Sequence, residues 1–482
     1  MRTSHHSCPF QGASDLTRRT FLAGCAACTS ASGAIGRALA AAAAGAAQAS
    51  SNASRTRIGL VFTHIPPDRP TWPNVGYDYE GRKRELADKL RQACPDIEWV
   101  PATAHNADEA KQILNQQPAV DGYLVYLVGI WSGAPRALVE SGRPVVLVDD
   151  FYAGSGEFLI EYARAKREGR RVTGVSSSRF EDVVAAAQCL ACTRKLREST
   201  ILAVTERKHV EAAAKHIGEV FGTTVKHLHG ADLNKAYESA SLDEARPWAE
   251  RWIAQAEKVV EPSREEIEKS ARMYLGMRSL MDQHNARAIT VDCLGLFYAG
   301  LMSAYPCLGF WELNNNGAIG ACECDLDSTI TMLAMTLATG RPGYISDPVV
   351  DTATNQVIYA HCVAPTKVFG QDGPTNPYHI RSHSEDRKGA CIRSLLPLGE
   401  MTTTLKFFAA RHEVIVHQGT SVANIDDDKA CRTKLAVEVA DADKVLEHWD
   451  QWGWHRVTFY GDLRPHVEHL SRLLGVKVVQ EG

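Results

Sequence analysis

The chain has 482 residues, a formal net charge of −4 and a hydrophobic content of 45%. This is enough apolar material for two or three domains, and a near-neutral charge without a basic stripe argues against a nucleic-acid-binding protein. After the first fifty residues, no stretch reaches the ~20 apolar residues that a membrane-spanning helix needs.

The first fifty residues have the pattern of an export signal. Arg18 and Arg19 precede an alanine-rich run, and Ala47-Gln48-Ala49 fits the small-x-small rule for cleavage. We therefore expect a twin-arginine signal peptide over residues 1–49, recognition by the twin-arginine export machinery, and a periplasmic or secreted location. The alternative is a flexible low-complexity tail.

Residues 57–148 alternate apolar strands with amphipathic helices. Strands are expected at 58–62, 97–100, 122–127 and 144–148, with helices at 82–93 and 107–115. This rhythm is typical of a parallel sheet covered on both faces, and it defines an N-terminal α/β domain over residues 50–168. No Gly-x-Gly-x-x-Gly turn follows the first strand, which argues against a dinucleotide site.

A second alternation starts at residue 172 and ends in a long helical stretch over 242–284. It predicts a second α/β domain with a helical extension over residues 169–285. From 286 to 482 most of the apolar segments lack intervening helices, which indicates a domain rich in antiparallel strands. We expect its strands near 344–351, 357–363, 378–383, 401–411 and 413–421.

One stretch, from Gly317 to Leu326, joins a short apolar strand to a helical pattern and carries two acids. Glu323 and Asp325 are two residues apart, and residues i and i+2 of a strand point to the same side. We expect both to face a crevice at the carboxyl end of the strand. Paired acids suit a metal site or an acid/base pair. Asp325 could instead only cap the helix, and the two roles are compatible.

Other candidate ligands lie outside this stretch. Glu312 lies in an aromatic-then-polar loop, His361 ends a β segment, and His455 opens a strand. Their structural alternatives are a surface acid, a satisfied core histidine and a histidine bound to a carbonyl. Carboxylates with one imidazole suit a hard divalent ion such as Mn²⁺ or Mg²⁺. Zinc fits less well, because no thiolate pair or His-x-x-x-His spacing is present.

Several motifs of the C-terminal half belong together: the segment from Cys322 to Leu326, the helix ending at Thr339-Gly340-Arg341-Pro342, Asp347, Asp351, His361-Cys362, and His455 ahead of Tyr460-Gly461-Asp462. They resemble the C-terminal domain of L-fucose isomerase-like proteins, whose superfamily includes the fucose and arabinose isomerases. The resemblance is specific from about residue 288 to 479. Before that it rests on the order of elements.

The resemblance implies two flavodoxin-like α/β domains followed by a C-terminal domain rich in antiparallel β strands. It also implies a homo-oligomer, trimer or hexamer, with sites between neighbours. The implied Mn²⁺ site consists of a glutamate, an aspartate and a C-terminal histidine. Asp325 matches the aspartate and His455 the histidine. Glu312 is the nearest candidate for the glutamate, but it lies closer to Asp325 than the family's spacing, and Glu323 is the substitute.

The implied reaction interconverts an aldose and a ketose through an enediol, with a small-molecule sugar as substrate. The metal would stabilise the charge that develops on the sugar oxygens. Glu312 and Asp325 would ligate the ion and shuttle the proton between C2 and C1, and His455 would complete the coordination. The sugar would be lined by Glu323, His361, Trp311 and Trp454. For the two tryptophans, core packing is the alternative.

If the protein is exported, two other functions are alternatives to an isomerase of free sugars. An exported protein could use the same metal site on a glycoside, as a hydrolase or epimerase. Two α/β units behind an export signal also describe a periplasmic sugar-binding protein without a metal. The additional β-rich region and the paired acids argue against the binding protein.

Overall fold

The computed structural model describes residues 55–208 and 210–482. The predicted signal peptide, with Arg18 and Arg19, lies outside the described residues, so export stays a prediction. Within the two described ranges, no helix combines the length and apolar character that crossing a bilayer requires.

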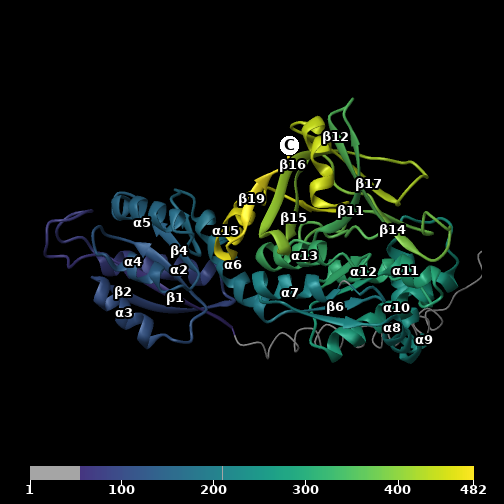
Figure 1. Ribbon diagram of the computed structural model, residues 1–482, viewed down its shortest axis with the longest axis horizontal. Helices are drawn as coiled ribbons and strands as arrows, with labels where there is room; N and C mark the ends of the chain where they lie inside the picture. Colours follow the sequence, from purple (N-terminus) through teal and green to yellow (C-terminus); the bar gives the residue numbers. More distant parts are fainter. Residues whose placement is uncertain (1–54, 209) are drawn as a thin grey trace, which may run out of the picture. The chain divides into compact units, whose positions relative to one another are not determined.

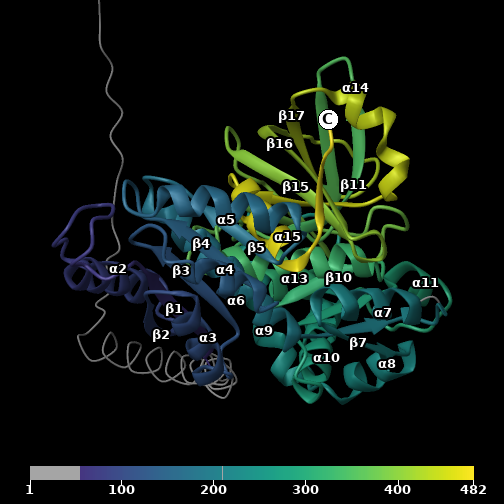
Figure 2. The same cartoon turned by 60° about the vertical axis from the view of Figure 1, so that its left-hand side comes forward.

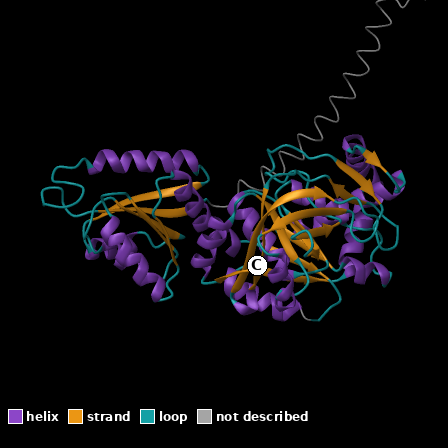
Figure 3. Ribbon diagram, turned by 90° about the horizontal axis from the view of Figure 1, so that it is seen from above, coloured by secondary structure: helices purple, strands orange, loops and turns teal. Residues whose placement is uncertain are grey.

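The first sheet is parallel and has the strand order β2-β1-β3-β4-β5, the order of flavodoxin-like folds. Its strands are β1 (Thr56–Thr63), β2 (Ile97–Ala104), β3 (Gly122–Leu127), β4 (Val145–Asp149) and β5 (Val172–Val175). Helices cover both faces (Figure 3): α2 (Tyr79–Ala93), α3 (Ala107–Gln116), α4 (Ala134–Glu140), α5 (Ser155–Arg167) and α6 (Phe180–Arg197). The apolar runs of the central strands are buried on both faces, as expected for a parallel sheet.

The second sheet is also parallel, with the order β10-β9-β6-β7. Its strands are β6 (Thr200–Val204), β7 (Thr224–Leu228), β9 (Ala288–Val291) and β10 (Ile319–Cys322). The helices of this region are α7 (Val210–Phe221), α8 (Gly230–Ser239), α9 (Leu242–Gln255), α10 (Arg264–Gln283), α11 (Cys293–Tyr298), α12 (Cys307–Asn315) and α13 (Leu326–Thr339).

Three strands pair differently from the predicted domain ranges. β5 lies beyond residue 168 but completes the first sheet against β4. β9 and β10 lie beyond residue 286 but complete the second sheet against β6. Local apolar pattern identifies such strands without fixing the sheet that they join.

The C-terminal strands form one sheet, ordered β15-β18-β11-β12-β17-β16-β19, and pairing of β15 with β16 closes six antiparallel strands into a barrel (Figure 1). They are β11 (Tyr344–Asp351), β12 (Gln356–His361), β15 (Met401–Phe408), β16 (Glu413–Asn424), β17 (Thr433–Val439), β18 (Arg456–Tyr460) and β19 (Lys477–Gln480). A small sheet joins β8 (Lys258–Val259), β13 (Tyr378–Arg381) and β14 (Cys391–Ser394). The predicted fold class, two parallel α/β sheets and an antiparallel C-terminal region, is confirmed.

The chain's last helix returns to its first sheet. α14 (Ala442–Glu447) precedes β18, and α15 (Arg464–Leu474) follows it and packs on α6 and β5 (Figure 2). His469 of α15 lies 2.7 Å from the Thr173 hydroxyl through its Nδ1. The Arg171 guanidinium donates to the carbonyl of Leu473. The C-terminal segment is therefore part of the packing of the N-terminal sheet.

Candidate metal centre

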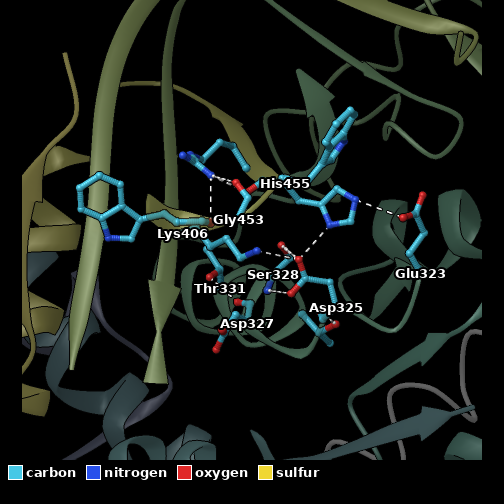
Figure 4. Close-up of polar contacts among 12 residues, drawn as sticks. Glu323, Asp325, Asp327, Ser328, Thr331, Lys406, Gly453 and His455 are labelled. Atoms are coloured by element: carbon cyan, nitrogen blue, oxygen red, sulfur yellow. Dashed lines mark hydrogen bonds and ion pairs between the residues drawn. The ribbon is translucent and has the colours of Figure 1, made fainter. Parts of the chain in front are cut away.

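A left-handed turn places the first acid of the centre. β10 ends at Cys322, and the next two residues, Glu323 and Cys324, have φ values of 63° and 54°. Residues other than glycine adopt this conformation at an energetic cost. Glu323 and Asp325 therefore do not extend together from a strand, as the i, i+2 spacing predicted. They approach His455 from opposite sides of its ring (Figure 4).

Asp325 is the N-cap of α13 and also a partner of the central histidine. Its Oδ1 accepts the backbone N–H of Ser328 at 3.0 Å. Its Oδ2 lies 2.7 Å from Lys406 Nζ and 2.9 Å from His455 Nδ1. Burial would raise the pKa of Asp325, but the charges of Lys406 and His455 outweigh it and hold that pKa well below its usual range. Asp325 therefore caps the helix and contacts His455 at the same time.

The other ring nitrogen of His455 faces two carboxylates. Nε2 lies 3.2 Å from Glu323 Oε2 and 3.2 Å from Asp347 Oδ1. Burial alone would lower the pKa of His455, but the carboxylates of Asp325, Asp347 and Glu323 raise it to about 11. Without a metal, the imidazole therefore carries a proton between the acids.

Asp347 is the residue that the sequence reasoning did not assign to the site. It lies on β11, and its Oδ1 also accepts the indole N–H of Trp454 at 2.8 Å. The other oxygen, Oδ2, lies 3.1 Å from His361 Nδ1. The signal in the sequence that could have identified Asp347 was the number of residues between the two acids of the site. Glu312 and Asp325 lie too close in the chain for the resemblance, whereas Glu323 and Asp347 are further apart.

The donor set fits a hard divalent cation. Glu323, Asp347 and His455 each offer one atom, and these atoms all lie within 4.8 Å of one another. An octahedral ion with bonds of 2.0–2.1 Å separates adjacent ligands by about 2.9 Å, close to the 3.2 Å from His455 Nε2 to each acid. Asp325 lies on the Nδ1 side of the ring, outside this group of donors. Carboxylates commonly occupy this position beside metal-bound imidazoles.

Glu312 does not join this centre. It lies on α12 rather than in a loop, 5% exposed, and its carboxylate accepts from Arg251 at 2.6 Å and from the indole of Trp252 at 2.9 Å. The structure therefore places the Glu312 carboxylate in an ion pair with Arg251 and does not bring it to His455, Glu323 or Asp347.

Of the residues expected to line the sugar, one lies in the core and three lie at the centre. Trp311 is 2% exposed, and its indole donates to Thr366, so it lies in the core and the packing alternative holds. Glu323, His361 and Trp454 do lie at the centre. His361 is 2% exposed, whereas Trp454 is 65% exposed and leaves its ring face accessible.

No family model matches the chain. Over 267 residues, the chain is 24% identical to a sulfoquinovose isomerase of Priestia aryabhattai and to one of Priestia megaterium. The alignment covers 52% of this chain and 57% of each relative. The chain thus spans little more than half the length of the curated relatives that it matches.

Proposed function

We propose that this chain is a divalent-metal-dependent isomerase that interconverts an aldose and a ketose. The observation that carries the proposal is the convergence of Glu323, Asp347 and His455 Nε2 on one point, with donor atoms that suit Mn²⁺ or Mg²⁺. The matched relatives are named as isomerases of a sugar, which supports a sugar as the substrate class.

Glu323, Asp347 and His455 would hold the ion. Once bound, it would supply positive charge beside the sugar oxygens on which negative charge develops during proton transfer. Asp325 keeps the Nδ1–H of His455 engaged and so leaves Nε2 as the coordinating nitrogen. Lys406, 5% exposed, balances the charge of Asp325 from the other side.

Glu323 is the carboxylate best placed to carry the proton between C2 and C1. Among the described residues its polar partner is His455 through Oε2, so Oε1 is available to a substrate. Its side chain is 28% exposed. Asp347, in contrast, is held by Trp454 and His361. We assign proton transfer to Glu323 and a holding role to Asp347.

Trp454 would present its exposed ring to the apolar face of the sugar while its N–H stays on Asp347. This contact would connect substrate binding to the position of a metal-holding carboxylate. A Trp454→Phe change keeps an aromatic ring and removes the N–H, so it separates stacking on the sugar from the hydrogen bond to Asp347.

The experiment is a panel of free aldoses and ketoses, sulfoquinovose included, incubated in D₂O with the Mn²⁺-loaded protein and followed by NMR. We expect interconversion of at least one pair, with a loss of ~10²-fold or more in Glu323→Gln. Asp351→Asn is the matched control, because Asp351 ends the same strand as Asp347 in an exposed turn. Conversion of glycosides but of no free sugar would replace the isomerase with a hydrolase.

The assembly and the location remain part of the proposal. A homo-oligomer, trimer or hexamer, is tested by light scattering of the purified chain. Export by the twin-arginine route is tested by the N-terminal sequence and compartment of the mature protein, with Arg18→Lys and Arg19→Lys expected to block it together.

A further inference from the structure

A second group of donors lies directly behind the proposed metal centre. Asp347 uses its two oxygens on different partners: Oδ1 faces His455 and Trp454, and Oδ2 faces His361 and Cys431. His361 ends β12, and it pairs with Thr433, two residues after Cys431. Neighbouring strands therefore bring a carboxylate, an imidazole and a thiol together.

The distances within this group are those of a zinc site. Cys431 Sγ lies 3.6 Å from Asp347 Oδ2 and 3.9 Å from His361 Nδ1, and His361 Nδ1 lies 3.1 Å from Asp347 Oδ2. Tetrahedral zinc bonds of ~2.0–2.3 Å place adjacent ligands about 3.4–3.6 Å apart. The three separations therefore agree with one face of a zinc tetrahedron to within about 0.3 Å.

His361 is buried, and side chains of further metal-binding types lie near its ring. The ring is 2% exposed, and its Nε2 has no hydrogen-bond partner among the described residues. Cys322 and Glu323 offer donor atoms that lie within 4.8 Å of a nitrogen of the same ring. Four side chains of types that bind metals, those of Cys322, Glu323, Asp347 and Cys431, therefore lie near this one buried imidazole.

We propose that Asp347 Oδ2, His361 Nδ1 and Cys431 Sγ form a second cation site, selective for zinc-like ions, which shares Asp347 with the first centre. Thiolate and imidazole donors favour Zn²⁺, whereas the carboxylate-rich first centre favours Mn²⁺ or Mg²⁺. Binding displaces the thiol proton of Cys431 to solvent. The fourth position is open to a water or another donor. This site goes beyond the proposed isomerase and does not require it.

The test uses the full chain, stripped of metal, supplied with excess Mg²⁺ and titrated with Co²⁺ as the zinc probe. We expect thiolate-to-cobalt charge-transfer absorption that saturates at one ion per chain and is lost in Cys431→Ser. Cys94→Ser is the control, since Cys94 is buried under the first sheet. Absence of the absorption in the wild type, or its persistence in Cys431→Ser, would overturn the site.

A second measurement needs no variant. Among the described residues every cysteine is free, and Cys431 is the one that is not fully buried. Zn²⁺ should slow its reaction with a thiol reagent by ~10-fold or more, and unchanged labelling would contradict the proposal. A cobalt signal without sugar conversion would keep this site and remove the isomerase, whereas conversion without the signal would do the reverse.

Discussion

One imidazole, His455, lies among three carboxylates. Asp325 holds Nδ1, and Glu323 and Asp347 face Nε2. Because these acids raise the pKa of His455 to about 11, its interactions stabilise the metal-free fold fully below about pH 6.5. That contribution is lost as the pH rises towards 11. A metal and a proton therefore compete for the same nitrogen.

This competition makes metal binding depend on pH. We expect the apparent affinity for Mn²⁺ to rise with pH between about 6 and 9, by up to ~10-fold per unit, with about one proton released per ion. Calorimetry in buffers of different ionisation enthalpy measures the proton count. Binding that is independent of both pH and buffer would show that Nε2 is not a ligand.

The role of Asp325 can be separated from its function as a helix cap. Asn caps helices as well as Asp, but Asp325→Asn leaves the ammonium of Lys406, 5% exposed, without its counter-charge. We expect a loss of about 3 kcal/mol in unfolding free energy and ~10–100-fold weaker metal binding.

The control for that change is Asp441→Asn, because Asp441 caps the exposed start of α14. Denaturant unfolding should show no measurable change there. Equal stability of the two variants would mean that Asp325 does no more than cap its helix.

For individual residues, the sequence identified the types of side chain in the site better than the side chains that each one contacts. The structure places Glu323, weighed as the substitute for Glu312, beside His455. The sequence could not exclude Glu312, because its partners Arg251 and Trp252 are far away in the chain. Asp347 was named only among the motifs of the resemblance and was given no role, because nothing in its local sequence distinguishes it from a solvent-facing acid of a strand.

Among the elements, the turn that carries His455 is fixed by a buried ion pair. The guanidinium of Arg456 donates to the carbonyls of Trp452, Gly453 and His455, and it pairs with Glu481 at 2.6 Å. Arg456 is 0% exposed. Glu481 follows β19 and also binds His417 of β16. The chain's end thereby holds the start of β18, and with it the histidine.

Breaking this pair should disturb both stability and the metal site. Glu481→Gln leaves a buried guanidinium uncompensated, and we expect a cost of about 3–5 kcal/mol together with weaker metal binding. Glu468→Gln, which removes two half-exposed ion pairs with Arg464 and Arg472, should cost less than ~1 kcal/mol. Both variants are compared by their denaturant midpoints and by metal titration. Equal midpoints and equal metal affinities in the two variants would show that Glu481 does not position His455.

Elements were predicted more reliably than their pairing. The alternating pattern of residues 57–148 and the β-rich C-terminal region follow from period and composition. The membership of β5, β9 and β10 in their sheets, and the closure of the barrel by β15 and β16, depend on contacts distant in sequence. No local pattern encodes those contacts.

For the molecule as a whole, the contact of α15 with the first sheet connects the C-terminal segment to the N-terminal α/β layer. His469 is 8% exposed beside Thr173, and burial lowers the pKa of this histidine to about 4. The unfolded chain takes up this proton near pH 6.5, so folding stability falls as the pH drops from about 6.5 to 4.

We expect this histidine to contribute about 3 kcal/mol of that fall. His469→Gln should flatten the dependence of unfolding free energy on pH in this range. His448→Gln, at an exposed position, should leave the dependence as it is. An unchanged slope in His469→Gln would mean that α15 does not bury a neutral ring against the first sheet.

The central claim is that Glu323, Asp347 and His455 bind one divalent cation. Its most direct test is the Mn²⁺ content per chain after reconstitution and removal of free metal, compared between the wild type, Asp347→Asn and Glu312→Gln. We expect about one ion in the wild type and in folded Glu312→Gln, and none in folded Asp347→Asn. A wild type that retains no ion, or an Asp347→Asn protein that retains a full one, would contradict the account.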